Sequence, residues 1–208
     1  AASDVYKRQG IPGLTAAQLI CVQSKIEEKT IFISGGNGAV GHLAIQLAKY
    51  RGAQIIATAR AGKVEKLKDL GADFVLDYAD PELDKKVLEF APNGVDYAVE
   101  VEFGENINII PKIMRAMGTV SIYGSGKNMN PQFPFGEYLF KSLTLNIILV
   151  YLMPTHLRKR LIKIIHDAYV KHALFPSIDS IYELGDCAKA HEQVIKPGRN
   201  GTVLLKID

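Results

Sequence analysis

The chain has 208 residues, of which 48% are hydrophobic and 23% charged, with 18 glycines, 9 prolines and no tryptophan. This composition is typical of a globular chain with one sizeable domain and excludes a disordered or low-complexity scaffold. The 25 Lys and Arg residues and 22 Asp and Glu residues leave a net charge of +3, and the surplus is spread along the chain. The charge therefore gives no reason to expect a nucleic-acid partner, and we expect a small-molecule partner instead.

The first nine residues are set apart from the fold, because residues 4–9 look like the in-frame translation of a sequencing-library adapter. We expect this segment to be non-native and the chain to be truncated at its N-terminus. A short helix is predicted next, over residues 11–22.

From residue 30 onward, short β-rich apolar runs alternate with segments of helical period, a pattern typical of a parallel sheet covered on both faces. The expected strands are residues 30–34, 54–58, 74–77, 95–101, 119–123 and 143–150. The expected helices are residues 40–48, which carry one apolar stripe and are followed by Gly52, then 63–70, 81–90, 105–117 with an interruption by proline, and 154–173. The predicted fold class is therefore α/β, a Rossmann-type doubly wound parallel sheet of six strands.

A tail follows the Phe175-Pro176 break, with strands expected over 178–184 and 202–207 and a helix over 188–195. These short strands need not extend the main sheet. We assign residues 10–173 to a dinucleotide-binding domain and residues 174–208 to a separate C-terminal segment.

The motif that carries chemistry is Gly36-x-Gly38-x-x-Gly41, which fits the dinucleotide fingerprint G-x-G-x-x-G. The motif follows a predicted strand and leads into the predicted helix that carries the apolar stripe. Ala39 and Val40 are the two residues between its second and third glycines. The first glycine is expected to make the tight turn, the second to let backbone approach a pyrophosphate, and the third to permit close helix packing. The alternative is a tight strand-to-helix turn that binds no ligand.

The second predicted strand decides which nicotinamide cofactor is expected, since an acidic residue at its end would bind the ribose hydroxyl of NAD. This chain has Thr58 and Arg60 there, followed by Lys63, and no carboxylate before Glu65. A hydroxyl and two cations suit a 2′-phosphate, so NADPH is the expected cofactor. The alternative is that these cations belong to an ordinary solvated surface.

Two rival motifs fail on their context. Gly41 is not followed by the Lys-Ser/Thr pair that a P-loop needs, which excludes a nucleoside triphosphate site here. Tyr123 and Lys127 have the Tyr-x-x-x-Lys spacing of short-chain dehydrogenases, but glycines directly after a strand are incompatible with the helix that this pair requires.

In order along the chain, these features resemble the medium-chain dehydrogenase/reductases, in the zinc-independent quinone oxidoreductase branch. The segments that carry the resemblance are residues 10–16, 35–49, 70–73, 77–78, 94–101, 118–125, 139–144 and 201–205. The resemblance implies hydride transfer from NADPH to a quinone or α,β-unsaturated carbonyl. It also implies an N-terminal catalytic domain that this chain lacks and that residues 174–208 would complete.

The resemblance also implies positions for the cofactor. It places Lys63 and Tyr78 at the 2′-phosphate and adenosine end, Thr15 near the nicotinamide ribose, and Tyr123 with Gly124 beside the nicotinamide. Arg60 matches a cofactor-side loop that is one residue shorter here than in many relatives. No catalytic residue is assigned by the sequence; Tyr123 as proton donor competes with a buried core role.

A metal-assisted mechanism is not expected, because residues 11–14 offer no cysteine where related zinc alcohol dehydrogenases carry a ligand. Cys21 is interpreted as a small core residue, and His42 as a packing or capping residue. The other four histidines are predicted to lie on the surface. Glu100 and Glu102 are expected either to line the cleft or to form a solvated rim.

Neither a membrane nor an export signal is expected, since the apolar run 147–153 is far shorter than the roughly 20 residues that a bilayer helix needs. Cys21 and Cys187 suggest no disulfide framework, so the expected location is the cytoplasm. The apolar run around residues 143–151 would be an edge strand, and the resemblance implies a homodimer through it. The alternative is that the chain's own tail or the absent domain covers this edge.

Three alternatives to the metal-free reductase remain open. Two are a zinc-dependent alcohol dehydrogenase and an enoyl-thioester reductase of the same superfamily. The third is a non-enzymatic NADPH-binding module. The sequence upstream of this chain distinguishes them, because a catalytic barrel, zinc ligands or a basic groove would each favour a different one.

Overall fold

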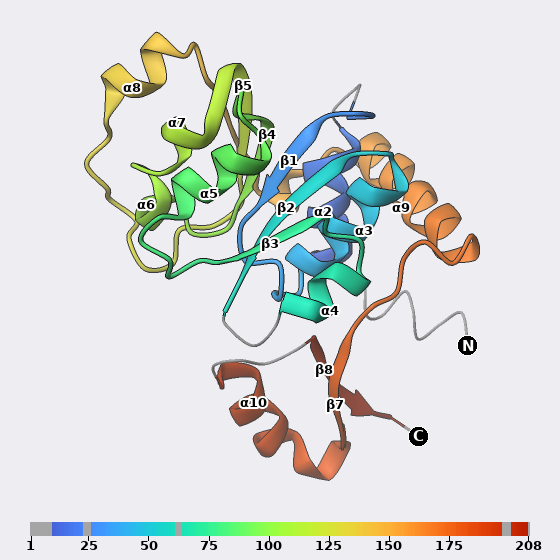
Figure 1. Ribbon diagram of the computed structural model, residues 1–208. Helices are drawn as coiled ribbons and strands as arrows, with labels where there is room; N and C mark the ends of the chain where they lie inside the picture. Colours follow the sequence, from blue (N-terminus) through green and yellow to red (C-terminus); the bar gives the residue numbers. More distant parts are fainter. Residues whose placement is uncertain (1–9, 23–25, 61–63, 197–200, 208) are drawn as a thin grey trace.

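The computed structural model describes residues 10–22, 26–60, 64–196 and 201–207, and at their centre is a parallel sheet of six strands (Figure 1). In spatial order the strands are β3 (Phe74–Asp77), β2 (Gln54–Ala59), β1 (Thr30–Ile33), β4 (Val95–Glu100), β5 (Met114–Ile122) and β6 (Thr144–Ile147). This order reverses between β1 and β4, as in a doubly wound sheet. The predicted fold class is confirmed.

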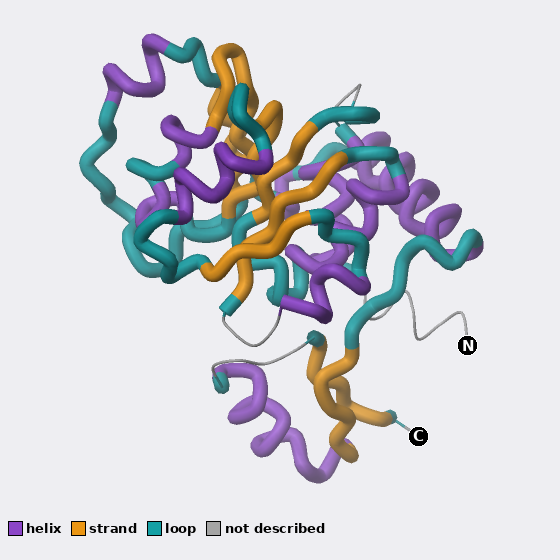
Figure 2. The backbone as a smooth tube through the Cα atoms, viewed as in Figure 1, coloured by secondary structure: helices purple, strands orange, loops and turns teal. Residues whose placement is uncertain are grey.

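Helices cover both faces of the sheet (Figures 1 and 2). One face carries α2 (Ile11–Cys21), α3 (Gly41–Tyr50), α4 (Val64–Asp69) and α9 (Thr155–Val170), and the other carries α5 (Leu83–Phe90), α6 (Phe103–Asn106), α7 (Ile110–Ile113) and α8 (Phe135–Phe140). Side chains alternate along each strand, so that Ile31 and Ile33 enter one hydrophobic core and Phe32 enters the other. Burial on both faces explains why the strands are nearly continuous apolar runs.

Helix α3 begins and ends where the sequence indicates. Its apolar stripe packs into the core beside α2, and Gly52 follows its end with a left-handed φ of 79°. Glycine adopts this conformation without the steric cost that a side chain brings. At its other end, the helix begins at Gly41, the last glycine of the fingerprint.

The predicted proline-interrupted helix over residues 105–117 is confirmed only in part, and its last four residues, 114–117, are wrong because they form a strand. The structure has two single-turn helices instead, α6 and α7, and β5 already begins at Met114. Pro111 lies in the first turn of α7, where its missing N–H is tolerated but a continuous helix through it is not. Met114 pairs with Val95 of β4, so strand pairing takes over where helical period was expected.

The last strand of the sheet is shorter than predicted. β6 ends at Ile147 rather than at residue 150, and a 3₁₀ turn, η1 (Val150–Leu152), follows. The turn brings Met153 into the core, where 5% of its surface is exposed. Helix α8, which lies between β5 and β6, was not predicted.

The C-terminal segment contains the two predicted strands, and they form their own parallel pair, which decides that they do not extend the main sheet. It consists of β7 (Ile178–Glu183), η2 (Leu184–Asp186), α10 (Cys187–Ile195) and β8 (Thr202–Lys206). Its lead-in is hydrogen-bonded to α3: Gln46 exchanges two bonds with the backbone of Phe175, and the Ser177 N–H donates to Nε2 of His42 at 3.1 Å. The tail is thus tied to the helix that follows the fingerprint.

No helix among the described residues has the length and apolar character that crossing a bilayer requires.

Candidate functional site

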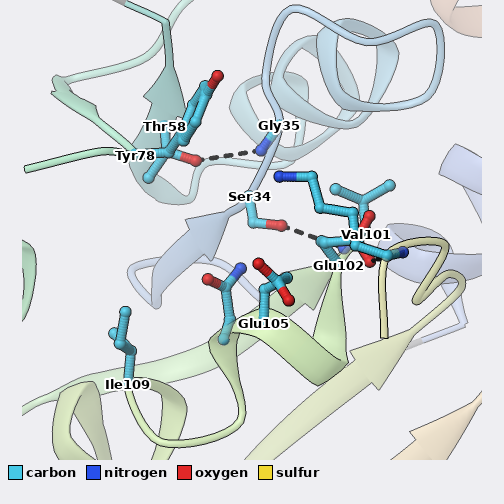
Figure 3. A pocket seen from close by; sticks show the side chains of 10 residues that line it. Ser34, Gly35, Thr58, Tyr78, Val101, Glu102, Glu105 and Ile109 are labelled. Atoms are coloured by element: carbon cyan, nitrogen blue, oxygen red, sulfur yellow. Dashed lines mark hydrogen bonds between the residues drawn. The ribbon is translucent and has the colours of Figure 1, made fainter. Parts of the chain in front are cut away.

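The carboxyl ends of the strands open a crevice where the strand order reverses, and this is the place where doubly wound sheets bind ligands. A cavity of about 510 Å³ lies there (Figure 3). On one side it is lined by Ser34 and Gly35 after β1, by Thr58 of β2 and by Tyr78 after β3. The cavity therefore spans the ends of three neighbouring strands.

The fingerprint loop is anchored to β2 by two hydrogen bonds. The Gly36 N–H donates to the Thr58 carbonyl at 2.8 Å, and the Gly35 N–H donates to the Thr58 hydroxyl at 3.1 Å. Gly36 lies inside the tight turn that the Gly38 N–H closes on the Gly35 carbonyl at 2.9 Å, and the left-handed residue of this turn is Gly35, with φ of 66°. Thr58 is only 2% exposed and fixes the loop as well as lining the cavity.

Close packing requires glycine at position 41 and leaves little space at position 36. A Cβ atom on Gly41 would lie 2.3 Å from the Gly35 carbonyl oxygen, and one on Gly36 would lie 2.6 Å from Cδ1 of Leu67 in α4. The predicted packing role of Gly41 is confirmed. Gly38 is different, because it is exposed and its missing Cβ leaves the backbone accessible at the turn.

The start of α3 presents backbone donors that the fold itself does not use. Within the described part of the chain, no acceptor is recorded for the N–H groups of Ala39, Val40 and Gly41. Free N–H groups at the start of a ten-residue helix favour an anion electrostatically and by hydrogen bonding. Together with the glycine cradle, these donors fit the pyrophosphate of a dinucleotide.

At the β2–β3 edge of the cavity, the structure brings together two of the residues predicted for the 2′-phosphate end. Nε of Arg60 donates to the Tyr78 hydroxyl at 3.2 Å, and this hydrogen bond raises the pKa of Arg60. The guanidinium is exposed, and within the described part of the chain it makes no ion pair with a carboxylate. Lys63, the second predicted cation, lies outside the described residues.

None of the three residues that were expected near the nicotinamide lines this cavity. Thr15 is buried on α2, where its hydroxyl donates to the Ile11 carbonyl at 2.8 Å. Burial raises the pKa of Tyr123, whose side chain packs against the core. Gly124 lets two strand ends approach, because a Cβ there would lie 2.5 Å from the Val101 carbonyl oxygen. Their roles toward the cofactor stay predictions.

The opposite wall of the cavity follows β4 and carries polar residues that the sequence reading largely missed. It consists of Val101, Glu102, Glu105, Asn106, Ile109 and Lys127. Beneath it, Glu100 is fully buried, and desolvation raises the pKa of its carboxyl group. The available sequence signal was the end of β4 at the switch point, which indicated Glu100 and Glu102. Glu102 lines the cavity, but the expectation for Glu100 is wrong, because this residue is fully buried and neither lines the cavity nor forms a solvated rim.

The histidine and cysteine interpretations agree with the structure. His42 is buried, and burial lowers its pKa; its Nδ1 lies 3.0 Å from the Gly38 carbonyl oxygen. Cys21 is buried in the core, where desolvation raises the pKa of its thiol to about 11. Residues 123–127 are not helical, so the Tyr-x-x-x-Lys spacing is a coincidence.

The described residues contain no group of three or more His, Cys, Asp or Glu side chains that fits a metal ion.

A comparison with protein families matches residues 39–167 to the family described as zinc-binding dehydrogenase. Among curated proteins, the chain is 30% identical over 163 residues to prostaglandin reductase 1 of Bos taurus, which covers 74% of this chain and 50% of that protein. It is 33% identical over 143 residues to the NADP-dependent oxidoreductase RED1 of Cochliobolus heterostrophus, with 65% of this chain and 40% of the relative covered.

Among solved structures, a mycobacterial quinone oxidoreductase superposes with a TM-score of 0.85 at 23% identity, covering 94% of this chain and 62% of that one. This similarity shows the fold. The chain spans about half the length of the curated relatives it matches.

Proposed function

Because the chain belongs to the zinc-binding dehydrogenase family of the medium-chain dehydrogenase/reductases, we propose that it is the cofactor-binding part of an NADPH-dependent oxidoreductase. The observation that carries the proposal is the fingerprint loop, with its glycine cradle beside unused N–H groups at the start of α3. The NADP-dependent relative RED1 adds support for the cofactor.

In this proposal the residues of the chain bind and orient the cofactor. The N–H groups of Ala39, Val40 and Gly41 hold the pyrophosphate, and Gly38 lets the backbone approach it. Arg60 and Tyr78, already hydrogen-bonded to each other, bind the 2′-phosphate by charge-assisted hydrogen bonds. When bound, the reduced nicotinamide supplies a hydride.

For the second substrate we propose a quinone or an α,β-unsaturated carbonyl, reduced without a metal. The sequence resemblance to the zinc-independent branch supports this class, and so does the relative named prostaglandin reductase. The acceptor slot is expected in a catalytic domain outside this chain, so the chain alone binds cofactor and does not turn over.

We also propose that two copies associate through the edge strand β6. Its outer side and the turn after it expose apolar side chains, among them Ile147 at 79%, Leu152 at 78% and Tyr151 at 67%. An exposed apolar strand edge tends to pair with another strand.

The cofactor proposal is tested by titrating the purified chain with NADPH and with NADH. Binding is monitored by the fluorescence of the reduced nicotinamide, and the chain contributes no tryptophan emission because it has no tryptophan. Tighter binding of NADPH is expected, and Arg60→Ala should reduce that preference by roughly 10-fold if one charge-assisted bond is lost. Lys85→Ala, at an exposed lysine on α5, is the matched control and should leave both affinities unchanged. Equal affinities for the two cofactors in the unaltered chain would contradict the assignment of Arg60.

A further inference from the structure

We infer that His42 is a pH-sensitive latch that holds the C-terminal segment against α3 and releases it when the imidazole is protonated. The latch links this tail to the sheet domain and is independent of the proposed cofactor. The imidazole lies between two backbone groups: Nδ1 is 3.0 Å from the Gly38 carbonyl oxygen of the fingerprint turn, and Nε2 accepts from the Ser177 N–H at 3.1 Å. One side chain therefore joins the fingerprint turn to the start of the tail.

The two partners of His42 determine its protonation state. A carbonyl oxygen only accepts hydrogen bonds, so Nδ1 must carry a proton to bond with Gly38. A backbone N–H only donates, so Nε2 must be unprotonated to accept from Ser177. The neutral imidazole with its proton on Nδ1 is the one form that satisfies both. In the imidazolium both nitrogens carry protons, and the Nε2 proton would then face the Ser177 N–H.

The surroundings of His42 disfavour its protonation at neutral pH. The residue is 3% exposed, and burial lowers the pKa of its imidazole below 6.5. The bond to the Gly38 carbonyl acts in the opposite direction, whereas the ammonium of Lys66 in α4 lowers the pKa further, because a second positive charge nearby is unfavourable. Within the described part of the chain, no carboxylate acts on the ring to stabilise the imidazolium. The latch is therefore closed at neutral pH and opens as the pH falls.

Ser177 is the point at which the tail leaves the sheet domain. Its carbonyl accepts from the Thr202 N–H of β8 at 2.8 Å, and its hydroxyl accepts from Nζ of Lys66 at 3.1 Å. A Cβ atom on Gly201 would lie 2.5 Å from the same carbonyl oxygen, so the start of β8 packs closely on this residue. Movement of the Ser177 backbone therefore moves the strand pair of the tail with it.

A second attachment of the linker does not titrate. The Gln46 amide exchanges two hydrogen bonds with the Phe175 backbone, at 2.6 and 3.0 Å, and its Nε2 also donates to the His42 carbonyl at 3.0 Å. An amide stays neutral at every pH in question, so these bonds persist when the imidazole is protonated. Repulsion between the imidazolium and Lys66 weakens the remaining bond to the Ser177 hydroxyl. Protonation should thus free Ser177 and the tail beyond it while residue 175 stays attached, which makes the linker a hinge.

The latch is tested on the 208-residue chain by NMR. Nitrogen chemical shifts of the His42 ring at pH 7.5 should identify the neutral form with its proton on Nδ1. Amide hydrogen exchange should show a protected Ser177 N–H at pH 7.5 and about 10-fold less protection at the lower pH at which the ring shifts report protonation, after correction for the intrinsic pH dependence of exchange. The Phe175 N–H, held by Gln46, is the internal control and should keep its protection.

Two variants separate the latch from a simple packing role. His42→Gln places an amide acceptor as far along the side chain as Nε2 but does not titrate, so Ser177 should stay protected at both pH values. His42→Leu removes the acceptor and should reduce the protection of Ser177 about 10-fold at both. His156→Gln, at an exposed histidine on α9, is the matched control and should keep the pH dependence of the unaltered chain.

Several results would overturn the latch. They are a proton on Nε2 of the neutral ring, a ring that stays neutral until the chain unfolds, and Ser177 protection that does not change when the ring is protonated. The same loss of protection at low pH in His42→Gln as in the unaltered chain would also overturn it. If His42→Leu does not fold, the comparison of the unaltered chain with His42→Gln still decides between a latch and a packing role.

Discussion

The contact between the start of α3 and the fingerprint loop leaves no room for a side chain at Gly41. In Gly41→Ala the new methyl group would lie 2.3 Å from the Gly35 carbonyl oxygen and 2.9 Å from both the Gly35 carbonyl carbon and Cα of Gly36. All three neighbours are backbone atoms, so relief requires the helix to move away from the loop rather than a side chain to rotate. Such overpacking typically costs about 1 to 3 kcal/mol of folding free energy.

For a domain of this size, that cost corresponds to a decrease in Tm of roughly 2 to 12 °C, measured by differential scanning calorimetry. The same displacement moves the N–H groups of Ala39 and Val40 away from the position proposed for the pyrophosphate, so NADPH affinity should fall as well. Gly185→Ala is the matched control, since no atom lies within 4 Å of the added methyl group. If Gly41→Ala and Gly185→Ala were equally stable and bound NADPH equally well, the close-packing argument would be refuted.

Three further predictions concern other parts of the fold. Burial raises the pKa of Glu100 above its ordinary value of 4.5, so this group costs the folded chain stability as the pH rises above 4.5. The Tm of Glu100→Gln, relative to that of the unaltered chain, should therefore increase from pH 4.5 to pH 8, and a Tm difference independent of pH would contradict this. Burial lowers the pKa of His42 below 6.5, so its contribution to stability is present above pH 6.5 and is lost as the pH falls. The free energy of unfolding in urea should therefore decrease less between pH 7.5 and pH 5 for His42→Gln than for the unaltered chain, and equal decreases would argue against it. Ile147→Lys places a charge on the exposed edge of the sheet and should convert a dimer to a monomer in light scattering, whereas an unaltered chain that is monomeric at micromolar concentration would exclude the proposed dimer.

The sequence predicted the sheet well because its signals there are local. Apolar strands buried on both faces, the stripe on α3 and the terminal glycine at position 52 all follow from near neighbours in the chain. The prediction over residues 114–117 failed because Met114 joins a strand only through its pairing with Val95, a contact that helical period does not encode. Tertiary pairing overrode local preference at that point.

At the candidate site, the sequence located the backbone elements better than the side chains. The fingerprint glycines and the Arg60–Tyr78 pair were indicated by spacing and resemblance, and the structure brings Arg60 and Tyr78 into contact. Asn106 and Glu105 carried no motif, since their place on the cavity wall depends on the break between α6 and α7. The bond from Asn106 to the buried Glu100 is likewise visible only in three dimensions.

The most direct test of the cofactor site is a crystal structure of this chain with NADPH bound. The account predicts the diphosphate within hydrogen-bonding distance of the Ala39, Val40 and Gly41 N–H groups, with the 2′-phosphate beside Arg60. NADPH bound at another surface, with the turn before α3 left without phosphate, would contradict it.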